Sequence, residues 1–354
     1  MITKLAIENF RGLKNVTLDH LRRVTILVGG NDTGKTSVLE AITLLLGDGT
    51  ALQSLPTAFR SSQQADEPKP AEQRAGHGSA ARGLRQEPRD DFENFWLWLF
   101  NDRDRSHKIV LEAWTSGERT VRLNYADRSS IQETVLLRNL AGGKQEAHIV
   151  FRPDGLSIPG LSSPPGLRVS RLSVRPSNPV EDAERYNQVA LNAGGEQRIE
   201  QVMRQINPEV RRLRYAKLPG TSSPLVFVDI GLSRAIPAPQ MGQAFNRLLH
   251  IYTEILSART NVLLVDEIEN GVFTTNLLPI WKGLLAVCEQ ENVQVFATTH
   301  SLECVRAVLI AAKERDKDEL SVQRMQVVSG QIEAVALSQE TLAYALENNL
   351  EIRK

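Results

Sequence analysis

The chain has 354 residues, of which 41% are apolar, so it is long enough for one large domain or two smaller ones with a substantial core. Lysine plus arginine and aspartate plus glutamate both number 42, which removes the simple electrostatic argument for a nucleic-acid-binding protein without excluding a local basic patch. Cys288 and Cys304 lack disulfide or zinc spacing, and the sequence shows neither a signal peptide nor 18 consecutive apolar residues, so we expect a cytoplasmic protein outside membranes.

The first part of the chain predicts short strands, a glycine-rich turn and a helix. Apolar alternation indicates strands at 3–10 and 16–18, and the wholly apolar run 24–28 (VTILV) is typical of a strand buried on both faces. This run leads into GGNDTGKT, after which SVLEAITLLLG has helical spacing and stops at Gly47.

The middle of the chain differs in composition and predicts two insertions. Residues 48–91 are rich in Gln, Pro, Gly and charge with few large apolar residues, which is typical of a mobile insertion. Residues 92–180 predict a β-rich insertion that begins with a short helix at 92–100 and ends in a Pro, Ser and Gly-rich loop at 153–180. Strands of an antiparallel sheet are expected at 108–114, 120–125, 131–137 and 147–151.

The last part of the chain alternates helices and strands. A helical pattern covers 182–206 with an interruption at Gly194–Gly195, and 224–230 predicts a strand, so 181–257 is expected to form a helical and strand-containing lobe. Further helices are predicted at 241–257, 277–290, 302–313 and 339–348, further strands at 261–265 and 293–298, and a hairpin at 322–328 and 331–337. We therefore predict an α/β fold whose core combines residues 1–47 and 258–354.

The turn after the first apolar strand matches the phosphate-loop pattern G-x-x-x-x-G-K-[ST] at Gly29, Gly34, Lys35 and Thr36. Glycines let backbone N–H groups turn toward phosphate oxygens, and the following helix directs its positive end to the same anion. Lys35 is expected to reach the β- and γ-phosphates of ATP, and the Thr36 hydroxyl to ligate Mg²⁺. The bland alternative is an ordinary glycine-rich turn. The expected nucleotide-binding loop comprises Gly29, Gly30, Asn31, Asp32, Thr33, Gly34, Lys35, Thr36 and Ser37.

A second buried strand ends in two carboxylates, Asp266 and Glu267, within VLLVDEIEN. In phosphate-loop ATPases an aspartate at this position holds Mg²⁺, and the glutamate after it can polarise the attacking water. The alternative is a pair of solvated acids at a strand end, followed by a third acid, Glu269. Together with the phosphate loop, the pattern favours a hydrolytic site at the carboxyl edge of a sheet.

A third strand ends at His300 in VQVFATTHS. A histidine there can hydrogen-bond the γ-phosphate or the attacking water and so report the nucleotide state. The alternative is a polar turn residue beside the helix caps Thr299 and Ser301. Its position one helix after the acidic strand favours the γ-phosphate sensor.

These three strand ends, in this order, resemble the ABC-type ATPase heads of the SMC, RecF and OLD-nuclease group, with the closest likeness to prokaryotic AAA-labelled ATPases that share the OLD-type head. The segments ITKLAIENFRGLKNVTL, LVGGNDTGKTSVLEAI, LLVDEIENG and FATTHSLE carry the resemblance over residues 1–47 and 180–354. It implies an ABC-type head with a mixed sheet, an antiparallel β lobe and a helical lobe with a signature segment. It also implies that Asn9 and Arg11 border the adenine.

The resemblance implies a homodimer, or a higher homo-oligomer, in which two heads enclose two nucleotides. The segment AIPAPQMGQAFNRLLHI stands where the family has its signature, so the backbone of Met241 and Gly242 would face the γ-phosphate bound by the partner. The usual Ser-Gly-Gly run is absent, Ala244 replaces a glycine, and Val272 and Phe273 replace a histidine that relatives often carry. The alternative is a helix N-terminus at 239–247 that packs internally.

Two differences from relatives shape the expected function. No heptads of a long coiled coil are present, and the chain ends at Lys354 without the nuclease domain of OLD proteins, so we expect a separately encoded nuclease or effector partner. The expected function is an ATP-driven switch in DNA repair or anti-phage defence. The alternative function is a DNA-binding repair module with weak ATPase activity. The arginines that would support DNA binding could instead form an ordinary solvated face of a strand. Arginines that would support DNA binding are Arg168, Arg171, Arg175, Arg204, Arg211, Arg212 and Arg214.

Overall fold

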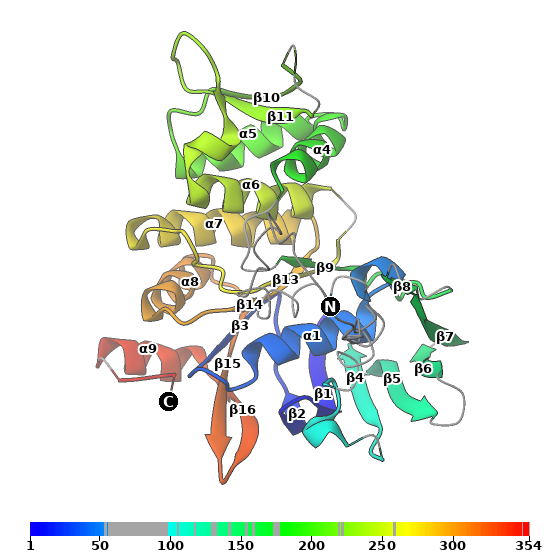
Figure 1. The fold of residues 1–354 in the computed structure, drawn as a ribbon. Helices are drawn as coiled ribbons and strands as arrows, with labels where there is room; N and C mark the ends of the chain where they lie inside the picture. The colour runs from blue at the N-terminus through cyan, green and yellow to red at the C-terminus, as the bar shows by residue number, and fades with distance from the viewer. Residues whose placement is uncertain are drawn as a thin grey trace, which may run out of the picture.

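Two β-sheets lie on opposite sides of helix α1 (Lys35–Leu46) in the computed structural model of the chain (Figure 1). A lobe of helices and short strands stands above the first sheet (Figure 1). The structure describes residues 1–52, 55, 98–104, 106–116, 118–128, 133–140, 143–152, 155–157, 160–172, 178–218, 220, 223–257, 260–348 and 350–353.

The first sheet has six strands in the order β16-β15-β3-β14-β13-β9 and is parallel except for β16. Its centre is β3 (Val24–Gly29), which pairs with β14 (Gln294–Thr298) on one side and β15 (Leu320–Val328) on the other. The remaining strands are β13 (Val262–Val265), β9 (Val169–Leu172) and β16 (Gln331–Leu337). The carboxyl ends of the parallel strands therefore meet at one edge, where a ligand site is expected.

Both faces of this sheet are covered, which explains the uninterrupted apolar runs of its strands. On one face, residues such as Val265 and Ala297 join a core with α6 (Gln243–Leu256), α7 (Thr274–Gln290) and α8 (Leu302–Glu314). On the other face, Leu264 and Phe296 pack into the core that contains α1. Successive strand residues thus alternate between two cores, as the period of two requires.

The second sheet has seven antiparallel strands in the order β2-β1-β4-β5-β6-β7-β8. It joins the first sheet through Gln294, whose buried side-chain amide exchanges two 2.8 Å hydrogen bonds with the backbone of Ile2. The antiparallel sheet predicted for the middle of the chain is confirmed, and the first two strands belong to it as well. The strands are β1 (Ile2–Phe10), β2 (Leu13–Leu18), β4 (Ile109–Thr115), β5 (Glu118–Arg128), β6 (Glu133–Leu140), β7 (Gly143–Arg152) and β8 (Gly155–Ser157).

Arg138 of β6 fastens this second sheet to α1. Its side chain is fully buried and donates to the carbonyls of Leu44 and Gly47 at the C-terminal end of α1, and to that of Ser162. The carbonyls of Leu44 and Gly47 are among those that a helix end leaves without partners inside the helix. Burial lowers the pKa of the guanidinium to about 10, and nearby Asp48 opposes the shift, so the group remains a cation at neutral pH.

The upper lobe in Figure 1 consists of α4, α5, α6 and a three-stranded antiparallel sheet. Asn178 caps α4 (Pro179–Ala190), and Gly194 caps α5 (Gly195–Ile206) with a left-handed φ of 74°. The strands of this lobe are β10 (Arg212–Ala216), β11 (Leu225–Asp229) and β12 (Ile236–Pro237), followed by the 3₁₀ turn η2 (Ala238–Met241). The predicted interruption at Gly194–Gly195 is confirmed, whereas β10 was not predicted.

Two sequence expectations need correction. The stretch 153–180 was expected to be a loop, but it contains β8 and β9, and β9 is an edge strand of the first sheet. The helix expected at 92–100 is wrong for 98–100, which form a turn and a bridge from Phe10 to Phe100 before the 3₁₀ turn η1 (Asn101–Arg103). Residues 92–97, and nearly all of the expected insertion 48–91, lie outside the described residues.

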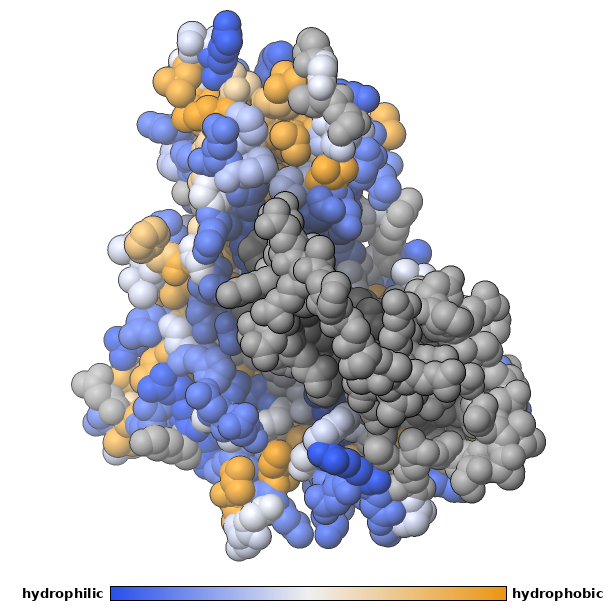
Figure 2. Space-filling model, viewed as in Figure 1, coloured by the Kyte–Doolittle hydropathy of each residue, from blue (hydrophilic) through white to orange (hydrophobic). Residues whose placement is uncertain are grey.

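The C-terminal part closes the first sheet. The predicted hairpin is confirmed as β15 and β16, and α9 (Gln339–Glu347) follows it with Ser338 as its N-cap. Hydrophobic side chains reach the surface near the end of this hairpin, at the bottom of Figure 2, where Val327 is 57% exposed. Within the described part of the chain, none of the helices combines the length and apolar character needed to cross a membrane.

Candidate active site

The phosphate loop leaves β3 at Gly29 and enters α1 at Lys35, as the sequence predicted. A Cβ at Gly29 would lie 2.7 Å from the Thr33 hydroxyl oxygen and closer still to the carbonyl of Met325, and φ there is 154°. Gly34, the N-cap of α1, has a left-handed φ of 81°. Both positions therefore require glycine to bring the loop backbone around to the start of the helix.

Lys35 lies inside this loop. Its ammonium donates to the carbonyls of Gly29 at 3.1 Å and Gly30 at 2.6 Å, and the residue is only 5% exposed. Burial lowers the pKa of Lys35, while the carboxylates of Asp266 and Glu267 oppose that shift. A desolvated cation at a helix N-terminus is suited to bind a polyanion such as a nucleotide phosphate chain.

A pocket of about 380 Å³ opens in front of the loop. It contains the polar residues predicted from Asn31 to Ser37, together with His300. The complete lining is Gly12, Asn31, Asp32, Thr33, Gly34, Lys35, Thr36, Ser37, His300 and Ile332. The first and third predicted strand ends thus meet in one cavity.

Asp266, which follows β13, contacts this pocket through its lining residue Thr36. Its carboxylate accepts a 3.3 Å hydrogen bond from the Thr36 hydroxyl and a 2.6 Å hydrogen bond from the Thr298 hydroxyl at the end of β14. Mg²⁺ is commonly held by one or two carboxylates together with substrate phosphates and water. The Thr36 hydroxyl and the Asp266 carboxylate are therefore the groups here that could hold Mg²⁺ together with a bound nucleotide.

Glu267 follows Asp266 in an unusual backbone conformation. Its φ is 47°, which is uncommon for a residue with a side chain. Its N–H donates to the Thr298 hydroxyl at 2.8 Å, and the Arg247 guanidinium of α6 donates to the carbonyls of Asp266 at 2.6 Å and Glu267 at 3.5 Å. These contacts hold the strained turn in place and therefore fix the backbone position from which the Glu267 side chain extends.

The turn at His300 is fastened on both sides of its backbone. Its N–H donates to the Glu269 carboxylate at 2.9 Å, and its carbonyl accepts from Arg353 at 2.7 Å. Ser301 caps α8 by accepting from the N–H of Cys304. The imidazole is thus presented to the pocket from a backbone that both the acidic loop and the C-terminus support.

The structure does not bring every predicted site residue to this pocket. Met241 and Gly242 stand at the start of α6 and are absent from the pocket lining, and Gly242 has a φ of 92° with no atom within 4 Å of a Cβ placed there. The Asn9 amide donates to the carbonyl of Lys108, and Arg11 pairs with Glu40 of α1 at 3.0 Å. Neither of the residues expected near the adenine lines the pocket.

Three residues near the site were not given a role from sequence. Thr298 joins Asp266 to the backbone of Glu267, Arg247 holds the same turn from α6, and Glu269 supports His300. Thr298 could have been recognised from the sequence, because it carries a hydroxyl at the end of the strand that follows the acidic strand. Adjacent parallel strands end at the same edge of a sheet. Arg247 had no such signal, since its contact depends on the packing of α6.

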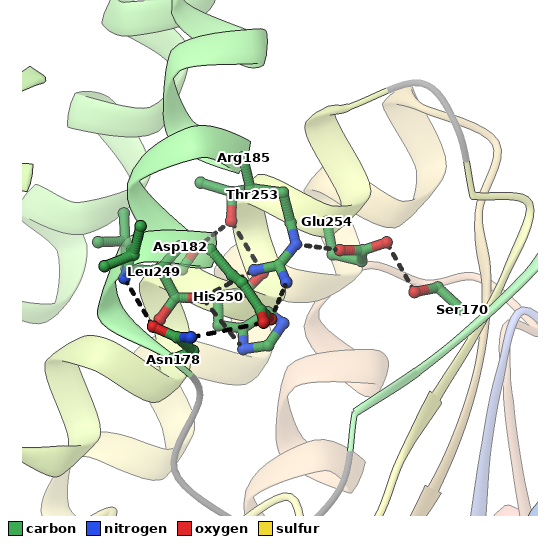
Figure 3. Close-up of polar contacts among 10 residues, drawn as sticks. Ser170, Asn178, Asp182, Arg185, Leu249, His250, Thr253 and Glu254 are labelled. Atoms are coloured by element: carbon green, nitrogen blue, oxygen red, sulfur yellow. Dashed lines mark hydrogen bonds and ion pairs between the residues drawn. The ribbon is translucent and has the colours of Figure 1, made fainter. Parts of the chain in front are cut away.

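A partly buried polar network holds α6 against α4 and β9 (Figure 3). Arg185 of α4 pairs with Asp182 at 2.7 Å and with Glu254 of α6 at 3.0 Å, and Glu254 also accepts from Ser170 of β9 at 2.6 Å. His250 of α6 lies 3.4 Å from Asp182. Burial, and then the nearby guanidinium groups of Arg185 and Arg247, nevertheless lower the pKa of His250 to about 3.

Comparison with known proteins agrees with this geometry. An “ATP/GTP phosphatase” of Helicobacter pylori is 19% identical over 356 residues, covering 89% of this chain and 90% of that protein. The DNA replication and repair protein RecF of Nitrosococcus oceani is 50% identical over 54 residues, or 15% of each chain. A solved SMC head bound to the C-winged helix domain of ScpA superposes with a TM-score of 0.54 at 12% identity, covering 96% of this chain and 98% of that chain. The fold is therefore that of an ABC-type, SMC-like ATPase head.

One family model spans most of the chain. It matches residues 24–306, a range that contains the phosphate loop, the acidic strand and His300. The likeness to OLD-type heads in particular remains an expectation from sequence. The chain belongs to the AAA_21 family, which is described as “AAA domain, putative AbiEii toxin, Type IV TA system”.

Proposed function

We propose that this chain binds ATP with Mg²⁺, hydrolyses it to ADP and phosphate, and closes as a dimer when ATP is bound. The observation that carries the proposal is the hydrogen-bonded series from the Thr36 hydroxyl to the Asp266 carboxylate and on to the Thr298 hydroxyl. It joins the phosphate loop to the acidic strand at the edge of the sheet where Lys35 is buried. An ordinary glycine-rich turn is not expected to bring a lysine ammonium, a threonine hydroxyl and an aspartate carboxylate together.

Each residue has a separate task in this proposal. The loop N–H groups from Gly30 to Gly34 and the Lys35 ammonium bind phosphate oxygens. Thr36 and Asp266 hold Mg²⁺, which supplies neutralising charge when bound. Glu267 orients and polarises the attacking water, and His300 hydrogen-bonds the γ-phosphate or that water.

The second half of the proposed site comes from another copy of the chain. Gly242, at the start of α6, is exposed and does not line the chain's own pocket, and a helix N-terminus is a good ligand for phosphate. Phe273, in the loop that follows the acidic strand, is 78% exposed, and a Cβ at nearby Gly271 would lie 3.1 Å from the Gln243 side chain at the start of α6. The two elements therefore form one continuous surface that a second copy can cover.

A switch needs a protein that responds to it. The solved SMC head carries a winged helix domain of ScpA, which supports the idea that a head of this fold binds a partner. We propose a separately encoded nuclease or effector in DNA repair or anti-phage defence as the partner here. Co-purification from the native host tests for this partner, and the absence of any co-eluting protein counts against the proposal.

Sizing the Glu267→Gln protein with and without ATP and Mg²⁺ tests the central proposal. The amide keeps the shape of the side chain but cannot accept the proton from water, so ATP should persist and the protein should elute as a dimer. The double variant Lys35→Ala, Glu267→Gln is the control and should remain monomeric. Monomeric Glu267→Gln with bound ATP would exclude the dimer, and hydrolysis at the parental rate would exclude Glu267 as the base.

A DNA-binding role is the second candidate. Arg211, Arg212 and Arg214 are exposed at the edge strand β10 of the upper lobe, where a duplex could approach. Two other arginines from the sequence argument do not contribute, because Arg171 is buried against Glu40 and Arg204 binds Glu200 and the carbonyl of Val210. Arg175 lies outside the described residues. A steep fall of duplex affinity with salt, lost in Arg212→Ala, Arg214→Ala, is the measurement that favours this role.

A further inference from the structure

The pocket in front of the phosphate loop has one wall of different character. Among the described residues that line it, Ile332 is the sole large apolar side chain, and it faces the loop from β16. Gly12, from the turn between β1 and β2, lies beside it. All other lining residues are polar or belong to the phosphate loop.

Ile332 rests on two glycines that have no side chain to keep it away. Its Cδ1 lies 3.3 Å from the position a Cβ would take at Gly12, and at the same distance from that position at Gly34. The residue is nevertheless only partly buried, so part of its side chain remains open to the pocket. A single isoleucine thus spans from the β1–β2 turn to the N-terminus of α1.

The position of Ile332 relative to the phosphate loop is fixed by backbone pairing. Met325 of β15 is in register with Gly29, the last residue of β3, and Val327 of β15 is in register with Ile332. The hairpin is therefore hydrogen-bonded directly to the strand that leads into the loop. A side chain held this way offers a rigid surface at low entropic cost to the ligand.

We propose that Ile332, together with the bare backbone of Gly12, is the surface on which the base and ribose of the nucleotide rest. This rests on the proposed nucleotide binding and assigns the part of the pocket that the phosphate-loop motif does not describe. The phosphates take the polar side near Lys35 and the helix N-terminus. The nucleoside then has the apolar side, where contact with Ile332 removes both surfaces from water.

Equilibrium binding of ADP and of inorganic tripolyphosphate, each with Mg²⁺, tests this assignment in the full chain. Ile332→Ala should weaken ADP binding about tenfold, equal to about 1.4 kcal/mol, through lost apolar contact. The affinity for tripolyphosphate, which has no nucleoside, should fall by less than about twofold. Ile332→Val removes only the terminal methyl and should weaken ADP binding by about threefold. This milder variant serves if alanine disturbs folding.

Two controls separate the alternatives. Val328→Ala truncates an exposed residue of the same hairpin that does not line the pocket, and it should leave both affinities unchanged. Equal losses of ADP and tripolyphosphate in Ile332→Ala would show that Ile332 only supports the phosphate loop, and unchanged ADP affinity would remove it from the site; either result overturns the assignment. If the parent protein binds ADP and Lys35→Ala does not, the proposed function stands whatever Ile332 does. If the parent binds neither ligand, both proposals fall.

Discussion

The phosphate loop and the start of α6 are both helix N-termini that begin with a glycine, but their surroundings differ. At the phosphate loop, Lys35 is 5% exposed, and Leu13 and Ile332 crowd the backbone of Gly34. At the start of α6, Gly242 is exposed and nothing lies within 4 Å of a Cβ placed there. The backbone at the start of α1 is thus enclosed by its own chain, although Asn31, Asp32 and Thr36 remain exposed, whereas the start of α6 is open to another molecule.

The contrast is consistent with the proposal that each chain supplies halves of two different sites. Arg247 and the network around Glu254 fasten α6 to the acidic turn and to β9, so the open helix start is held firmly although it is exposed. Under the proposed function, this rigid and exposed helix start is available to bind the phosphate held by a second copy.

Removal of the Lys35 ammonium should have the largest effect. Lys35→Ala should weaken ATP binding about 100-fold or more, because charge-assisted hydrogen bonds contribute about 1.5–3 kcal/mol each. Titration calorimetry measures the affinity, and Lys14→Ala, an exposed lysine on β2, is the matched control. Similar ATP affinity in the two variants would mean that the loop does not bind phosphate.

Loss of the Thr298 hydroxyl should act on hydrolysis more than on binding. Thr298→Val keeps the shape but removes the bond to Asp266 and the acceptor for the Glu267 N–H, so kcat should fall about 30-fold, or about 2 kcal/mol. The KM for ATP should change by less than about threefold. Thr298→Ser restores the hydroxyl and should recover most of kcat. An equal rate for the valine and serine variants would show that the hydroxyl has no such role.

A side chain at Gly242 should impair the open helix start without harming the enclosed pocket. Gly242→Val is strained at a φ of 92° and should lower hydrolysis about tenfold while nucleotide affinity stays within about twofold. Gly194→Val is the control, since Gly194 also caps a helix with positive φ and open space but belongs to α5.

Mixing two defective proteins sharpens this result. Lys35→Ala lacks a working loop and Gly242→Val lacks a working helix start, so a mixed dimer contains one intact site. Equal mixtures should recover about a quarter of the parental rate if each site is shared between two copies. No recovery, with dimers present, would place the α6 start outside the hydrolytic site.

Protonation of His250 makes the stability of the network that holds α6 depend on pH. The pKa of His250 is about 3 in the folded chain, below the ordinary value of 6.5, so the unfolded chain binds the proton first as pH falls. Stability from this residue is present above pH 6.5 and declines toward pH 3, by about 2 kcal/mol between pH 7 and pH 5. Urea unfolding of the parent and of His250→Gln at both pH values measures it. A pH-independent difference between the two proteins would mean that His250 is not held neutral.

Local patterns in the sequence were sufficient for the elements that carry the enclosed site. The runs VTILV and VLLV are apolar because both faces of their strands are covered, and such runs are recognisable without a structure. The phosphate loop was recognised because the glycines, the lysine and the threonine act through neighbouring backbone atoms. β9 was missed because its four residues, VSRL, lie in a Pro and Gly-rich stretch and become a strand only by pairing with β13.

By itself, the sequence determined that Gly29 to Thr36 form a phosphate loop, that Asp266, Glu267 and His300 end neighbouring strands, and that the fold is α/β. Only the tertiary structure decided that Thr298 bridges Asp266 and Glu267, that Arg247 holds the same turn, and that Ile332 forms the apolar wall of the pocket. The first group depends on backbone conformation over a few consecutive residues. The second depends on contacts between segments tens to hundreds of residues apart, which arise only when the sheet order and helix packing are complete.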